Sequence, residues 1–134
     1  MIRPAELILP ELRTRLTGVT VVSDVTDVDH RTFPLIIITP TGGNRHPKGP
    51  HTLSLANISM AANTKTDFAS AETLYYTALD ALYDMQEDQK VTSKGWVHSI
   101  TELMGCTRAN PLFEDTWRVI GTIRIGLRPN KTTI

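Results

Sequence analysis

The 134-residue chain has little of what several specialised functions need. Its one cysteine, Cys106, excludes an internal disulfide and a cysteine-based zinc site, and a single thiol suits a reducing compartment. The longest aliphatic runs, Leu7–Leu9 and Leu35–Ile38, are far too short to cross a bilayer. The first residues include Pro4 and Glu6 where a signal peptide would need basic residues and an apolar run. The sequence therefore predicts neither a membrane span nor secretion.

The chain also has no excess of either charge. Fourteen Lys and Arg residues stand against fourteen Asp and Glu residues, which gives a formal net charge of zero. A protein whose main task is to grip phosphates releases counterions through a basic surface, so a dedicated DNA-binding module is not expected. A hydrophobic content of 40% is typical of a soluble globular chain that buries a core. The length predicts one domain, residues 1–134.

The hydrophobic periodicity predicts two helices. Leu9, Leu12 and Leu16 repeat at helical spacing before Gly18, and Pro10 inside this segment predicts a kink or a helix that begins there. Apolar residues from 68 to 82 follow the same spacing after capping residues at 64–67. Strands are expected at Val19–Val22, Phe33–Thr39, Thr52–Met60, Trp96–Leu103 and Trp117–Leu127.

Successive strands without intervening helices favour an α+β fold over a doubly wound parallel sheet. We expect a four- to five-stranded, mostly antiparallel or mixed sheet with two main helices on one face. One long loop is expected at about residues 40–51, a bulge or bend within Thr52–Met60, and a short flexible C-terminal tail at about 129–134. The last strand alternates, and its arginines share the face away from the helices: Arg118, Arg124 and Arg128.

The residues offer little for catalysis or metal binding. The four histidines are scattered, and the cluster Asp24–His30 lacks the glycine and distal glutamate of a calcium loop. Gly42 and Gly43 are not followed by the Lys-Ser/Thr pair of a phosphate-binding loop, and Cys106 reads as a packed thiol. We expect a protein that is not an enzyme and has no catalytic, cofactor-binding or metal-binding residue.

The two charge signs are separated along the chain. Residues 67–88 hold six acids and no base, whereas residues 116–134 hold four bases and no acid. Glu72, Asp80, Asp84 and Asp88 are spaced by multiples of four and therefore stack along one helix face. Both surfaces can be solvated faces of a monomer, or the acids of one copy can meet the bases of the next in a contact that closes a ring.

The order of the elements resembles a known family. The segments that carry the resemblance are Leu12–Leu16, Val19–Val22, Phe33–Ile38, Ala71–Leu82 and Trp117–Arg128. Together they resemble the tail terminator, or tail-completion, proteins of long-tailed bacteriophages of the siphophage type. The resemblance covers nearly the whole chain as a pattern and includes no catalytic signature.

The resemblance implies a structural virion protein at the head-proximal end of the tail, made in the host cytoplasm. It implies a homo-hexameric ring that ends polymerisation of the major tail tube protein and offers a surface to the head-completion or neck protein. Genomic DNA would pass through the ring without sequence-specific binding. The alternatives are a neck protein at the adjacent ring and a small-ligand-binding regulatory domain, for which a deep apolar pocket with convergent polar groups is expected.

The expected contact residues come from the long loop, the acidic helix and the basic strand. Loops at Pro40–His51 and Cys106–Asp115 are expected to order on assembly. If the helix acids line the central hole, their charge would keep DNA from sticking. The candidates for a subunit or partner interface are Thr41, Gly42, Gly43, Asn44, Arg45, Lys48, Glu72, Asp80, Asp84, Arg108, Arg118, Arg124 and Arg128.

Overall fold

The computed structural model describes residues 3–23, 33–45, 53–111 and 115–129. Within these ranges the chain forms two helices and five strands, which confirms the α+β class. In chain order the elements are α1 (Pro4–Arg15), β1 (Thr20–Val22), β2 (Leu35–Arg45), β3 (Ser54–Thr64), α2 (Phe68–Asp88), β4 (Trp96–Ala109) and β5 (Trp117–Arg128).

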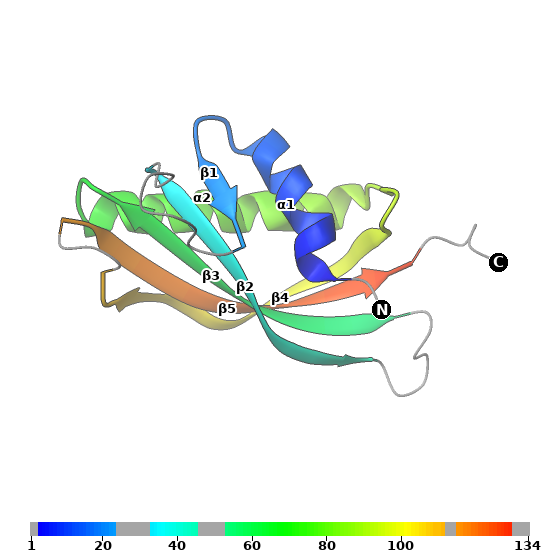
Figure 1. Cartoon of the computed structure of the whole chain (residues 1–134). Coiled ribbons are helices and arrows are strands. Elements are labelled where there is room, and N and C mark those ends of the chain that lie inside the picture. Colours follow the sequence, from blue (N-terminus) through cyan, green and yellow to red (C-terminus); the bar gives the residue numbers. More distant parts are fainter. Residues whose placement is uncertain (1–2, 24–32, 46–52, 112–114, 130–134) are drawn as a thin grey trace.

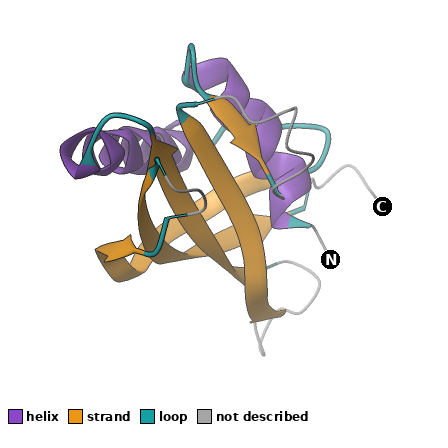
Figure 2. Ribbon diagram, turned by 60° about the vertical axis from the view of Figure 1, so that its left-hand side comes forward, coloured by secondary structure: helices purple, strands orange, loops and turns teal. Residues whose placement is uncertain are grey.

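The five strands form one mixed sheet in the order β1-β2-β3-β5-β4. β1 pairs with β2 in parallel, and the other neighbours are antiparallel. Both helices lie on one face of the sheet, as expected (Figure 1 and Figure 2). The other face is called the open face below, and β4 forms one edge of the sheet (Figure 1).

The main core lies between the helices and the sheet. From β5 it takes Val119, Ile123, Ile125 and Leu127, which confirms the alternation read from the sequence. A second cluster on the open face contains Leu35, Ile37 and Ala61. The apolar run of β2 is therefore buried on both faces, as a continuous aliphatic strand predicts.

Helix α2 begins where its capping residue predicts. The Asp67 carboxylate accepts a 2.7 Å hydrogen bond from the backbone N–H of Ser70, one of the donors that a helix start leaves unpaired. The helix continues to Asp88, and Gln89 ends it in the left-handed conformation with a φ of 46°. The helix therefore ends within the polar stretch Gln86–Lys94.

Helix α1 differs from one of the two expectations about Pro10. It begins at Pro4 and runs through Pro10 to Arg15, so the expected start at Pro10 is wrong. Pro10 is exposed, and so is Glu6, the residue whose carbonyl Pro10 leaves without its intrahelical partner. The helix is tied to β1 by Arg13, whose Nε donates to the Val21 carbonyl at 3.0 Å.

The expected long loop at 40–51 is partly wrong. Residues 40–45 continue β2 as a strand, with a register shift between Pro40 and Gly42. Gly42 and Gly43 have φ values of 125° and 133°, a conformation that glycine adopts without strain and that carries the chain through this bulge. The expected bulge within Thr52–Met60 is also wrong, because β3 pairs without interruption and the shift lies on its partner. Residues 46–51 lie outside the described ranges.

Strand β4 is longer than the sequence predicts. It passes Gly105 and continues to Ala109, with register shifts between Val97 and Ser99 and again between Glu102 and Thr107. The expected loop at Cys106–Asp115 therefore begins inside a strand, and residues 112–114 lie outside the description. The expected C-terminal tail also lies outside it from residue 130.

Candidate functional site

The open face carries the arginines of β5. Arg124 is paired across the sheet with Asn57 of β3 and Thr101 of β4, so these three side chains share that face. Its Nε donates a 3.2 Å hydrogen bond to the Asn57 Oδ1. The paired positions that the structure describes on the open face of β3, β4 and β5 include no acid.

A small hollow of about 100 Å³ lies beside Arg124. It is lined by Gly43, Leu55, Asn57 and Arg124, so it joins the end of β2 to the middle of β5. A Cβ atom at Gly43 would lie 2.7 Å from the Ala56 Cα, which requires glycine at this wall. The structure thus brings together two of the predicted interface residues from opposite ends of the chain, Gly43 and Arg124.

The other two arginines of the open face are held differently. Arg128 lies over the Trp96 ring, with its guanidinium carbon 6.0 Å from the ring centroid. The Nε of Arg118 is buried and has no hydrogen-bond partner among the described residues. Arg124, in contrast to these two half-buried arginines, is exposed and lies beside the hollow.

The acids of α2 fall into a paired set and an unpaired set. Glu72 lies 3.3 Å from Arg108, whose guanidinium also covers the Phe68 ring at 4.6 Å, so two predicted interface residues contact each other within one chain. At the other end Asp88 pairs with Arg15 at 3.0 Å. Asp80 and Asp84, between them, are exposed and have no ion pair within the described residues.

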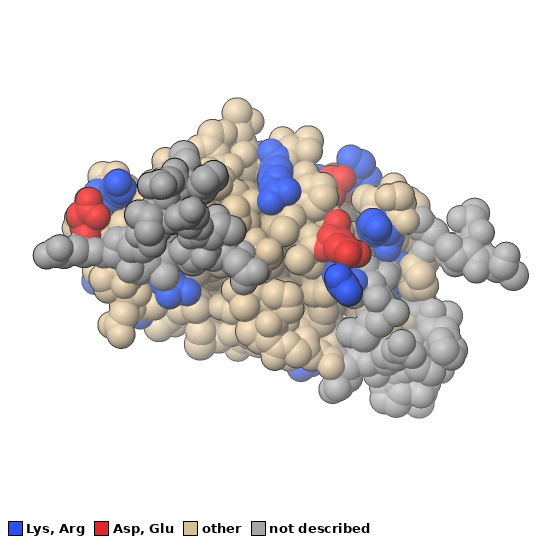
Figure 3. All heavy atoms as spheres, in the orientation of Figure 1, with Lys and Arg blue, Asp and Glu red and all other residues tan. Residues whose placement is uncertain are grey.

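The remaining predicted interface residues lie at the end of β2 or beyond it. Thr41 and Gly42 are exposed near the β2 bulge, and Asn44 and Arg45 contribute backbone pairs to β3. Lys48 lies outside the described residues. On the side of the molecule that Figure 3 shows, acidic and basic groups adjoin one another in a largely uncharged surface. The separation of acidic from basic residues therefore concerns α2 and the open face of the sheet.

An apolar strip on β4 was not predicted. Leu103 and Met104 are 45% and 42% exposed on this edge strand, and Tyr76 of the neighbouring helix is 51% exposed. Tyr76 also shares a hydrogen bond with the Cys106 thiol, whose pKa is raised by burial. A raised pKa opposes thiolate formation, in keeping with a packed thiol. The sequence feature that could have predicted this strip is the apolar pair Leu103 and Met104 directly before Gly105.

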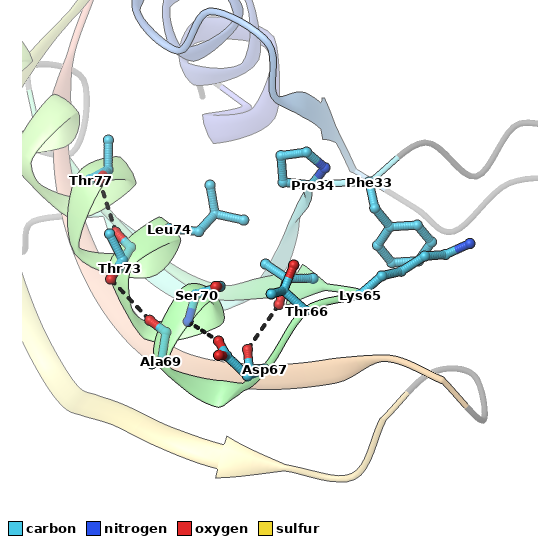
Figure 4. A pocket seen from close by; sticks show the side chains of 11 residues that line it. Phe33, Pro34, Lys65, Thr66, Asp67, Ala69, Ser70, Thr73, Leu74 and Thr77 are labelled. Atoms are coloured by element: carbon cyan, nitrogen blue, oxygen red, sulfur yellow. Dashed lines mark hydrogen bonds between the residues drawn. The ribbon is translucent and has the colours of Figure 1, made fainter.

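A larger pocket of about 640 Å³ lies between α2 and the start of β2 (Figure 4). Pro34 and Leu74 line it from the two sides, and Phe33 and Lys65 lie at its outer end, where the ammonium is 5.1 Å from the ring centroid. Its remaining lining residues are mainly hydroxyl-bearing: Thr64, Thr66, Ser70, Thr73 and Thr77.

The polar groups of this pocket are largely bonded to its own walls. Thr73 donates to the Ala69 carbonyl at 2.9 Å, Thr77 donates to the Thr73 carbonyl at 2.8 Å, and Thr64 donates to the Asp67 carbonyl at 3.0 Å. These hydroxyl protons are used by the backbone and do not converge on the cavity. The pocket has the size that a small ligand needs, but these three hydroxyls do not supply converging donors that would orient one.

The described residues contain no group of three or more His, Cys, Asp or Glu side chains placed to hold a metal ion. No helix among them is long and apolar enough to span a membrane.

The described residues form a small α+β domain with exposed acids on α2 and an exposed arginine on the opposite side of the sheet. The sequence model of the family described as phage tail termination protein matches residues 1–134. The chain belongs to this family, which makes it a structural protein of the phage tail.

Curated relatives agree with this assignment. The chain is 43% identical to the gene 22 protein of Mycobacterium phage L5 over 127 residues, covering 93% of this chain and 91% of that protein. It is 40% identical to the gene 22 protein of Mycobacterium phage D29 over 135 residues, covering 99% and 97%. Among solved structures, a chain from the virion of a native gene transfer agent particle aligns with a TM-score of 0.49 and 13% identity, covering 91% of this chain and 84% of that chain.

Proposed function

We propose that copies of this chain form a homo-hexameric ring on the head-proximal end of the tail tube. The ring ends polymerisation of the tube protein and offers the surface to which the head-completion or neck protein binds. Genomic DNA passes through its centre without sequence-specific contacts. The observation that carries this proposal is the family match over residues 1–134.

The surfaces of the domain support a role in assembly. Asp80 and Asp84 on α2 and Arg124 on the open face lie on opposite sides of the sheet and carry opposite charges. Different surfaces that bind each other repeat head to tail, and such a contact closes into a ring when the rotation per copy allows it. The exposed apolar edge at Leu103 and Met104 gives a further surface for contact with the tube or a neighbouring copy.

Two other functions are less well supported. A neck protein at the adjacent ring would use similar surfaces, and it would bind the head side without limiting tube length. A small-ligand-binding domain is favoured by the volume of the pocket at Leu74 but disfavoured by the inward bonding of its hydroxyls.

The test is tube length in infected cells. A phage with a stop codon early in this gene should give filled heads without tails and tubes of uncontrolled length, and the gene supplied from a plasmid should restore joined particles of normal length. Electron micrographs measure both. Tubes of normal length that fail to join heads would contradict termination and favour the neck protein instead.

A further inference from the structure

The strands below α2 separate two surfaces of opposite charge. α2 packs on β3, β4 and β5 from the helix side, and residues 68–88 include no Lys or Arg. Arg124 lies on β5 beneath the same helix but points to the open face, where the described pairs of these strands include no acid. A second copy that stacks on the open face through its α2 would therefore bring acids to a basic surface.

The hollow at Arg124 has the features of a carboxylate-binding site. Asn57 accepts the Nε hydrogen bond and so fixes the plane of the guanidinium. The four N–H donors on the two terminal nitrogens have no hydrogen-bond partner among the described residues, and their fork matches the two oxygens of a carboxylate. Leu55 and the backbone at Gly43 complete the walls, so an entering carboxylate leaves part of its water behind.

Asp80 and Asp84 are exposed acids in the middle of the acidic row, without an ion pair among the described residues. They lie one turn apart on α2, so their charges repel each other at a spacing where like charges are mildly destabilising. The ends of the acidic row are already neutralised by Arg108 and Arg15 within the chain. A cation from another molecule would relieve the repulsion in the middle of the helix.

We propose that the hollow at Arg124 binds the Asp80 or Asp84 carboxylate of a second copy of this chain. α2 of one copy then lies on the open sheet face of the next, and the repeated contact builds the ring. This inference rests on the proposed function and names the contact between neighbouring subunits. It also assigns these two acids to the subunit contact instead of the central hole.

The test is charge reversal with rescue. Two variants place like charges together at the contact: the single variant Arg124→Glu, and the double variant Asp80→Arg with Asp84→Arg. Each should raise the concentration at half assembly by at least about tenfold. The triple variant restores opposite charges and should recover most of the loss. Sedimentation velocity measures assembly, with the purified chain alone and with purified tail tubes. Glu6→Lys, on the exposed side of α1, is the matched charge control and should assemble as the wild type does.

The outcomes separate this contact from the proposed function. Normal assembly of Arg124→Glu, or no recovery in the triple variant, would overturn the contact while the ring itself stands. Intact rings that release DNA more slowly when Asp80 and Asp84 are reversed would place these acids in the central hole, which also overturns the contact. A wild-type chain that never caps tubes would contradict the proposed function. Unchanged thermal midpoints show that each variant is folded.

Discussion

Single residues decide how closely α2 approaches the sheet. Gly121 lies on the core face of β5, at the one position where the alternation of large apolar residues is interrupted. The Tyr75 ring fills the space that a side chain would need there, since a Cβ at Gly121 would meet the hydroxyl and would lie 2.7 Å and 2.9 Å from two ring carbons. The sequence pattern showed a strand with this face inward but did not show which helix residue occupies the gap.

Gly121→Ala is therefore expected to destabilise the fold. The Tyr75 side chain is fully buried and surrounded, so overpacking should lower the free energy of unfolding by about 1 to 3 kcal/mol. Gly126→Ala is the matched control on the same strand, because the nearest atom there is the Ser99 Oγ, the end of a side chain that can rotate. Urea denaturation of both variants measures the difference. Equal losses would show that the strand tolerates no Cβ at either glycine and would refute the role of Tyr75.

At the scale of elements, the hydrophobic periodicity predicted the helices and strands correctly. Their first and last residues were predicted less well. α2 and β5 follow from their apolar spacing because each buries one continuous stripe in the main core. The predicted strand ends at Thr39 and Leu103 came too early, because glycines within long strands mark bulges and register shifts that only the pairing partners reveal. The hollow beside Arg124 also could not be predicted from the sequence. It depends on the strand register that places Asn57 next to Arg124.

The start of α2 depends on the charge of Asp67. The hydrogen bond from the Ser70 backbone lowers the pKa of this carboxyl, so its stabilising effect is present above the ordinary aspartate pKa of about 3.9 and is lost as the pH falls through the lowered value. Asp67→Ala should lower the thermal midpoint at pH 7, and the deficit should shrink in acid. Asp67→Asn should retain part of the cap. Asp80→Ala, which removes an acid without a hydrogen bond among the described residues, is the control. A deficit independent of pH would argue against the charged cap.

At the scale of the whole molecule, a net charge of zero includes two surfaces of opposite sign. Residues 67–88 and 116–134 carry opposite signs, and the fold places α2 and the Arg124 side chain on opposite sides of one sheet. The sequence showed the separation of signs but could not show that Glu72 and Asp88 are neutralised within the chain, because Arg108 and Arg15 are distant in sequence. The acids of α2 that are exposed and have no ion pair among the described residues are Asp80, Asp84 and Glu87.

The edge of the sheet provides the last prediction. β4 is a long edge strand, and such edges pair with other chains unless they are protected. Leu103 and Met104 are each more than two fifths exposed, so Leu103→Ser with Met104→Ser should change the free energy of unfolding by no more than about 0.5 kcal/mol. The same variant should bind tail tubes or neighbouring copies more weakly, which sedimentation with purified tubes measures. Val91→Ser, at a side chain 65% exposed in the turn before β4, is the matched control. If both variants bind equally well, the strip is an ordinary solvated edge, whereas a loss confined to β4 identifies it as a contact surface of the assembled tail.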